Sequence, residues 1–367
     1  MGAVDVGLDL FGLPPAAEAR LTVRDTLEHQ AELVRQAHGR RRAVVARLLG
    51  GHGMADGTDE QIFAAPLSID DARLLVANEH GYRDWPDATA HGADPVDRRF
   101  EAAADAVVTG DLDTLRTLLA QRPVLVAARS TYPHHATLLH HVAANGVEQT
   151  RQHSPGNAVQ VARMLLAAGA DPDARCDTYG GRWNTPMELL VSSAPPADAG
   201  VQADLVEVLC AGGACPDGPD DDGAPLWTAI TWGYTDSVRR LVACGARVDN
   251  LVFAAVAGDL AQVSSYFGGH GQARHPRPVA AASAGRVGRR GPVLDPDRML
   301  EYALIYAASH GRADIVEFLL TKQPDLQVRE PAHGATALGA AGYRHPSAGR
   351  PAGSPAVVRL LEAVHPR

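Results

Sequence analysis

Short apolar stretches with helical spacing recur along the chain, and a glycine follows each of them. In one stretch, Leu138, Leu139 and Val142 fall on one side of a helix. Thr137 precedes them and Gly146 follows them. A threonine oxygen can accept a hydrogen bond from a free amide at a helix start, and glycine readily adopts the left-handed conformation that ends a helix. The pattern predicts one short helix here.

A second short helix is predicted after an interruption, and the two helices together form a unit that recurs. The second helix carries the paired Leu165 and Leu166 and is followed by Gly169. The same order of helix, helix and glycine returns twice further along the chain. These two copies occupy 184–214, beginning N-T-P-M-E-L-L-V, and 224–246, beginning A-P-L-W-T-A-I-T-W-G.

This self-similarity, with a period of roughly 33 residues, resembles the ankyrin repeat, whose inner helix opens with T-P-L-H-x-A-A. The resemblance is strong in the three units above and weaker in the flanking copies, as is typical of terminal capping repeats. It implies an all-α ankyrin-repeat solenoid of helix-turn-helix units with short hairpin fingers. With the weaker copies at 100–119, 251–267, 302–320 and 336–361, we count about seven units.

The start of the chain follows a different pattern. Apolar residues at helical spacing run over 21–49, and Ser68 begins a capping box ahead of a further helix. This piece resembles a short helical module that precedes ankyrin arrays in bacterial proteins, with Trp85 as its packing anchor. We therefore expect an N-terminal helical capping module at 1–95 and an ankyrin-repeat domain at 96–367.

Three insertions interrupt the repeats. Two lie at 147–156 and 192–200, in adjacent units, and both lengthen the link between two helices. Long loops in compact repeats are more often functional than idle, and we expect these two side by side at one end of the array. The third, at 268–296, is rich in Gly, Ala, Pro and Arg. Because it has few residues to bury, we expect a loosely held loop.

Composition and charge narrow the classes of function. The chain has 367 residues and a formal net charge of −9, which disfavours binding to nucleic acid or to an anionic membrane. The four cysteines show no zinc-site spacing, and we expect no metal and no cofactor. No secretory signal or membrane-spanning run is evident, so we expect a cytoplasmic protein. The single lysine, Lys322, indicates a GC-rich bacterial genome.

The register of the repeats predicts a binding surface. Inner-helix positions that follow the signature histidine by one, four and five residues point into a concave groove, because the other faces pack on neighbouring units. Trp232, Phe253 and Tyr306 make the middle of this groove aromatic, which is typical of recognition hot spots. Our first hypothesis is a monomeric protein–protein interaction module that binds a segment of a partner protein there. Its candidate binding residues are His141, Asn145, Trp232, Phe253, Tyr306, His310, Tyr343 and Arg344.

Histidines crowd the front of the second unit, and they suggest an alternative. His140 occupies the signature position, where the resemblance implies a structural role in hydrogen bonding to backbone. We find no such role for His134, His135 and His141, which with Arg151 could form a polar site suited to acid–base chemistry near neutral pH. The alternative is therefore a small-molecule-binding protein or an enzyme that uses non-metal acid–base catalysis under the paired insertions. No nucleophile elbow, phosphate loop or metal-ligand spacing accompanies these residues, so the sequence favours the interaction module.

Overall fold

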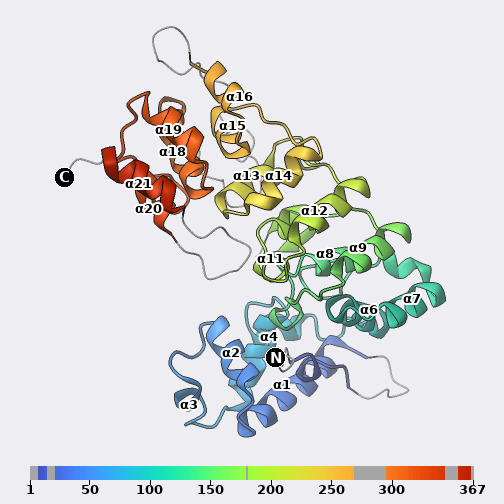
Figure 1. Cartoon of the computed structure of the whole chain (residues 1–367). Coiled ribbons are helices and arrows are strands. Elements are labelled where there is room, and N and C mark those ends of the chain that lie inside the picture. Colours follow the sequence, from blue (N-terminus) through green and yellow to red (C-terminus); the bar gives the residue numbers. More distant parts are fainter. Residues whose placement is uncertain (1–6, 15–20, 179–180, 268–294, 344–353, 365–367) are drawn as a thin grey trace. The chain divides into compact units, whose positions relative to one another are not determined.

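Two compact units make up the chain, Met1–Gly181 and Arg182–Arg367, here called unit 1 and unit 2. The computed structural model describes residues 7–14, 21–178, 181–267, 295–343 and 354–364. Helices dominate both units (Figure 1), and the strands within the described ranges are β1 (Cys176–Thr178) and β2 (Arg182–Asn184). The expected all-α class is confirmed. None of the described helices is both long enough and apolar enough to cross a bilayer.

Unit 1 begins with a group of helices that share one hydrophobic core. α1 packs against α4, and Leu27, Val34 and Leu75 are buried in the core between the helices. The helix start expected at Ser68 is present, since Ser68 Oγ accepts a hydrogen bond from the Asp71 N–H at 3.0 Å. The elements are η1 (Leu8–Leu10), α1 (Val23–Gly39), α2 (Ala43–Gly51), α3 (Asp59–Ile62), α4 (Ile69–Glu79) and α5 (Trp85–Ala90).

Trp85, the expected packing anchor of this module, begins α5 and is partly buried against the same core. The Arg73 guanidinium lies over its ring, 5.5 Å from the centroid. This distance is within the range of a cation–π contact, which holds the ring in addition to its packing on the core.

Two helix pairs follow in unit 1. α6 packs on α7, α8 packs on α9, and the first helices of the two pairs also pack on each other. Thr137 precedes α8 as expected, and its backbone N–H donates to Nδ1 of His140 at 3.1 Å. His140 is fully buried and has a structural role. The elements are α6 (Arg98–Thr109), α7 (Leu112–Gln121), η2 (Pro123–Val126), α8 (Leu138–Val142), η3 (Gln149–Arg151) and α9 (Ala158–Ala167).

Unit 2 repeats this arrangement. α10 is paired with α12, α13 with α14, α15 with α16, α18 with α19 and α20 with α21, and the first helix of each pair packs on the first helix of the next. Stacked helix pairs of this kind are the arrangement that the ankyrin resemblance implied. The elements are α10 (Pro186–Leu190), α11 (Ala194–Asp198), α12 (Gln202–Ala211), α13 (Ala224–Thr231), α14 (Thr235–Ala243), α15 (Leu251–Ala257), α16 (Leu260–Ser265), η4 (Pro296–Arg298), α18 (Met299–Ser309), α19 (Ala313–Leu320), α20 (Ala337–Gly342) and α21 (Pro355–Val364).

A glycine ends the second helix of each strong repeat. Gly169, Gly213 and Gly245 have φ values of +96°, +100° and +100°. Residues with a Cβ rarely adopt this left-handed conformation, which explains why glycine recurs at the position. The predicted register of these three units is therefore correct at the helix ends.

The insertions differ in structure. The one at 147–156 contains η3, and Glu148, Thr150 and Arg151 within it are buried. The one at 192–200 contains α11. Most of the third, 268–294, lies outside the described residues. The first insertion is in unit 1 and the second in unit 2, so their expected adjacency stays a prediction, as does the division of the chain at residue 95.

The repeated leucine of the second helices gives a test of the register. Leu165, Leu209 and Leu241 are 0%, 2% and 0% exposed. We expect each Leu→Ala change to lower the free energy of unfolding by about 2 to 5 kcal/mol, because apolar contacts are lost and a cavity is left. Urea unfolding measures this, with Leu260→Ala as the control, since Leu260 is 38% exposed. Equal losses at the control and at the three buried positions would contradict the register.

Candidate functional site

Three of the four candidate catalytic side chains are buried inside unit 1. His134 is 6% exposed, His141 0% and Arg151 5%. His135 is exposed on the hairpin before α8, where its φ is +48°. The structure brings His134, His141 and Arg151 together, as the candidate polar site requires, but it buries all three side chains. The physical reason is that the insertion at 147–156 folds inward: its Glu148 contacts His134, and its Arg151 contacts Glu101 of α6.

Glu148 of this insertion holds the buried side chains together. Its Oε1 atom lies 3.3 Å from His134 Nε2, 3.3 Å from His80 Nδ1 and 3.4 Å from Arg151 Nη1. Arg151 Nη1 also donates to Glu101 Oε2 at 2.6 Å. The insertion thereby connects the end of α4, the start of α6 and the hairpin before α8. We call the set the buried network; its members are Glu79, His80, Glu101, His134, His141, Glu148 and Arg151.

Glu79 extends the buried network into the N-terminal helices. Its Oε1 atom accepts from the backbone N–H of Thr150 at 2.8 Å and from the Thr150 hydroxyl at 3.0 Å. Its Oε2 atom lies 2.8 Å from His52 Nε2. His80, the next residue after Glu79, stacks on Tyr132 with 3.9 Å between ring centroids. These contacts join the N-terminal helices to the first helix pairs through polar groups.

Burial and neighbouring charges shift the protonation equilibria of the buried network. Burial and the Arg151 charge together lower the pKa of His141 to about 3. Burial alone would raise the pKa of Glu148, but the charges of Arg151 and His134 outweigh it and hold that pKa well below its usual value. Burial raises the pKa of Glu101. His141 is therefore neutral near pH 7, with Nδ1 donating to the Thr137 carbonyl at 3.1 Å.

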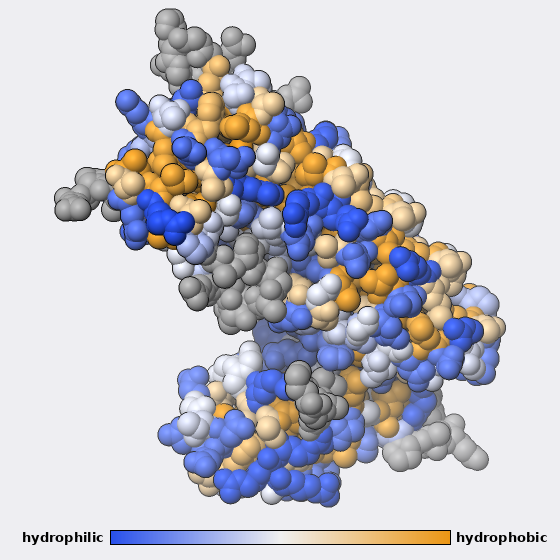
Figure 2. All heavy atoms as spheres, viewed as in Figure 1, coloured by the Kyte–Doolittle hydropathy of each residue, from blue (hydrophilic) through white to orange (hydrophobic). Residues whose placement is uncertain are grey.

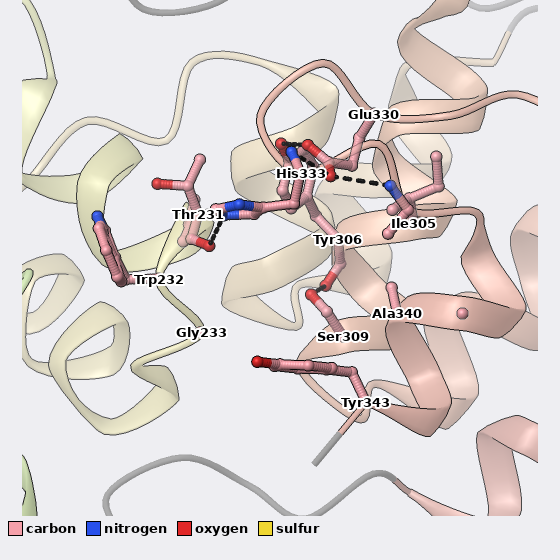
Figure 3. A pocket seen from close by; sticks show the side chains of 13 residues that line it. Thr231, Trp232, Gly233, Ile305, Tyr306, Ser309, Glu330, His333, Ala340 and Tyr343 are labelled. Atoms are coloured by element: carbon pink, nitrogen blue, oxygen red, sulfur yellow. Dashed lines mark hydrogen bonds between the residues drawn. The ribbon is translucent and has the colours of Figure 1, made fainter. Parts of the chain in front are cut away.

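A pocket of about 570 Å³ lies in unit 2 and contains several predicted binding residues. Its walls come from the ends of α13 and α18, from α20 and from the hairpin between α19 and α20. Figure 3 shows the rings of Trp232, His333 and Tyr343 around one space, with Trp232 on one side and Tyr343 on the other. The remaining lining residues are Ile230, Thr231, Gly233, Ile305, Tyr306, Ser309, Glu330, Ala335, Gly339 and Ala340.

The rim of the pocket is aromatic and accessible. Trp232 is 42% exposed and Tyr343 61%. The rings of Trp232 and His333 lie 6.3 Å apart at 72°, an edge-to-face arrangement. Figure 2 shows apolar patches separated by polar side chains on the visible face, not one continuous apolar surface. Exposed aromatic groups at a hollow, set among polar groups, are typical of an anchor point for a partner.

Glu330 forms the polar wall of the pocket. It is 3% exposed, and its Oε2 atom accepts from the Tyr306 hydroxyl at 3.0 Å. The backbone N–H groups of Ala332, His333 and Ala335 donate to the same carboxylate at 2.6, 2.7 and 3.2 Å. Burial and the Glu330 charge raise the pKa of Tyr306 well above its usual value. Glu330 therefore fixes both the hairpin and the tyrosine.

Three predicted binding residues of unit 2 are buried, which corrects the predicted groove. Phe253 and Tyr306 are each 3% exposed and His310 is 4%. Trp227 packs against Phe253 and Tyr306, with ring centroids 6.4 and 5.4 Å away. The aromatic rings of three consecutive repeats thus pack on one another inside unit 2. Tyr306 reaches the pocket wall, whereas Phe253 belongs to the core.

The other candidates are placed as follows. His310 is locked in place, with Nδ1 2.7 Å from the Thr235 hydroxyl and Nε2 2.9 Å from the Ile230 carbonyl. Asn145 is half-buried in unit 1, and Tyr343 lines the pocket. Arg344 lies outside the described residues. Of the eight predicted binding residues, the pocket brings together Trp232, Tyr306 and Tyr343.

Sequence reasoning missed Glu330 and His333 at the pocket, and Glu101 and Glu148 in the buried network. A weak signal existed for Glu330, because an acidic residue four positions before a hairpin glycine-alanine can bind the hairpin amides. Glu148 and Arg151 are three residues apart in an irregular segment, which carries no comparable signal. Among the described residues, no group of three or more His, Cys, Asp or Glu side chains is arranged to hold a metal ion.

Comparison with known proteins gives a likeness in structure alone. No protein-family model matches the sequence, and no curated protein matches it. Among solved structures, the chain is similar to the ankyrin repeat domain of human ASB11, with a TM-score of 0.38 and 20% sequence identity. The match covers 72% of this chain and 98% of that domain. The function therefore has to be inferred from the pocket and its lining.

Proposed function

We propose that the chain is a protein-interaction module, which binds a segment of a partner protein over the first helices of unit 2 and anchors it in the pocket. The observation that supports this most directly is the rim: Trp232 and Tyr343 are large aromatic residues that stay 42% and 61% exposed at a hollow of about 570 Å³. Rigid aromatic side chains of this kind contribute much of the binding energy in protein interfaces.

Two properties of the lining suit recognition of a chain segment. The pocket opens between helix ends and a hairpin, so a partner chain that crosses it can continue over the neighbouring surface. The hairpin is held rigidly, because Glu330 binds three of its backbone N–H groups and His333 Nε2 donates to the Thr231 carbonyl at 3.2 Å. A preformed site avoids part of the ordering cost of binding.

Catalysis at the histidine residues of unit 1 is not proposed. A general acid or base must reach the proton that it transfers. His134 and His141 are 6% and 0% exposed, and each has a hydrogen-bond partner in the protein. Their contacts with the insertion and with α8 give them the structural role that sequence reasoning had not found.

We expect Trp232→Ala and Tyr343→Ala each to weaken partner binding by at least about fivefold, because an aromatic anchor contributes more than about 1 kcal/mol. The probe is a library of random 12-residue peptides displayed on phage and selected against the full chain. Affinities of the selected peptides are then measured by fluorescence polarisation. Trp183→Ala is the matched control, since Trp183 is 49% exposed and does not line the pocket.

Circular dichroism of each variant establishes that it is folded. Selected peptides that bind wild type and both pocket variants equally would show that the pocket is not the binding site. An equal loss in the Trp183 variant would show that exposed tryptophans contribute without regard to the pocket, which also contradicts the proposal.

A further inference from the structure

We infer that the anchor taken by this pocket is a guanidinium group, the side chain of an arginine in the partner segment. This inference rests on the proposed function and names the chemistry that the pocket recognises. Three properties of the lining support it: the charge of Glu330, the hydrogen-bonding groups that remain available, and the aromatic rings at the rim.

The first property is an uncompensated negative charge. Glu330 is 3% exposed, and the groups that donate to its carboxylate are the Tyr306 hydroxyl and three backbone N–H groups, all of which are neutral. Among the described residues, no lysine or arginine lines the pocket and none forms an ion pair with Glu330. Four hydrogen bonds satisfy this carboxylate but do not cancel its charge, so a cationic occupant of the pocket is favoured over a neutral or anionic one.

The second property is an excess of hydrogen-bond acceptors. The Thr231 hydroxyl donates its proton to the Thr228 carbonyl at 3.0 Å, and the Ser309 hydroxyl donates to the Tyr306 carbonyl at 2.9 Å. Both residues line the pocket, and each hydroxyl oxygen keeps lone pairs that can accept. An occupant rich in N–H donors matches this wall, and a guanidinium group offers five of them.

The third property is the arrangement of aromatic rings. Trp232 and Tyr343 face the same space from two sides, and the His333 ring stands at 72° to Trp232 (Figure 3). A planar cation can stack on an indole or phenol face while its edge donates hydrogen bonds. A compact ammonium group gains the charge interaction without the stacking, so arginine is favoured over lysine.

The test uses the phage-selected peptides with the full-length wild-type chain, which removes any question of misfolding. We expect the selected peptides to share an arginine. Replacing that arginine by citrulline, a neutral group of the same shape, should weaken binding at least tenfold, and lysine should fall between the two. Binding of the arginine peptide should also weaken as salt is raised, because charges contribute.

A variant of Glu330 tests whether its carboxylate supplies the negative charge that the arginine recognises. Glu330→Gln should narrow the difference in affinity between the arginine and citrulline peptides, since the variant lacks the negative charge. A thermal melt establishes that the variant is folded, and the citrulline peptide serves as its internal control because that peptide lacks the charge. If this variant changes the affinities of the arginine and citrulline peptides by the same factor, the role assigned to Glu330 is overturned.

The outcomes separate this inference from the proposed function. If peptide binding depends on Trp232 and Tyr343 but citrulline binds as well as arginine, the guanidinium assignment is overturned and the interaction module stands. If the peptides bind without regard to Trp232 and Tyr343, the proposed function fails and the guanidinium assignment fails with it. Selected peptides that carry no arginine would also overturn the assignment.

Discussion

Replacing Arg151 by methionine is expected to lower the free energy of unfolding of unit 1 by about 3 to 5 kcal/mol, because removal of one partner leaves buried carboxylates without their counter-charge. The Arg151 side chain is 7% exposed and contacts Glu101, Glu148 and Asp105. Glu101 and Glu148 are themselves 3% and 1% exposed at the side chain. Methionine keeps much of the apolar stem, so the loss reports on charge more than on packing.

Arg116→Met is the matched control. Arg116 pairs with Asp113 on the surface, where the two side chains are 61% and 93% exposed. Solvent screens this ion pair, so its removal should change the free energy of unfolding little. Urea unfolding followed by circular dichroism compares the two variants. A second variant, Arg151→Met with Glu148→Gln, should recover part of the stability, because one of the uncompensated charges is also removed. If Arg151→Met and Arg116→Met unfold at the same urea concentration as wild type, the buried network does not stabilise unit 1.

The parts of the fold that depend on local chemistry could be predicted from the sequence. Thr137 and His140 form a cap within one turn, and Gly169, Gly213 and Gly245 end helices through their own backbone conformation. Each signal lies within a few residues along the chain, so the residue types alone are sufficient. The same holds for the buried leucines of the second helices, whose apolar spacing sets the face that packs.

The contacts that side chains make between neighbouring repeats could not be predicted from the sequence. A fixed offset from the signature histidine placed Phe253 and Tyr306 in an open groove, but α15 and α18 lack that motif. Their rings pack against Trp227, and the Tyr306 hydroxyl reaches Glu330, 24 residues further along the chain. Which face of a helix is exposed to solvent depends on the helices that pack against it. The sequence of a weak repeat contains no local motif that identifies this face.

The buried network shows the same limit more strongly. His80 and Glu148 are 68 residues apart, and Thr150 and Glu79 are 71 apart. The sequence placed the crowded histidines under the paired insertions, but nothing in that segment shows that Glu148 of the insertion reaches His134 and His80. Trp232 and Tyr343, which the same offset selected, stay exposed and line the pocket, because they follow the last turns of α13 and α20.

The stability of unit 1 should fall as the pH is lowered from neutrality, and His141 should account for much of this. Its pKa is about 3 in the folded protein and about 6.5 when unfolded, so below pH 6.5 the unfolded chain gains a proton that the folded chain does not. The folded state is therefore disfavoured by about 1.4 kcal/mol per pH unit through that window. His141 faces Arg151, Glu148 and His134, and the Phe100 ring lies 6.2 Å from its own.

The two carboxylates that face this region act in opposite directions. Glu148 has a lowered pKa, so its contribution is present above its unfolded pKa and is lost as the pH falls through its folded value. Glu101 has a raised pKa, so the folded state holds its proton more tightly and gains stability as the pH falls. Both contributions cancel when the free energy of unfolding of a His141 variant is subtracted from that of wild type, because the two proteins share these carboxylates.

His141→Asn provides that difference, since the asparagine amide can donate to the Thr137 carbonyl as Nδ1 does. We expect the variant to be less stable than wild type at pH 7, because a buried ring is lost and leaves a cavity. The gap should narrow by about 1.4 kcal/mol for each unit between pH 6 and pH 4, since the variant has no proton to gain at this position. Urea unfolding at pH 7, 6, 5 and 4 measures the gap. Parallel pH profiles for the two proteins would mean that His141 takes up a proton in the folded state as readily as in the unfolded one, and hence that unit 1 does not seal the ring from water.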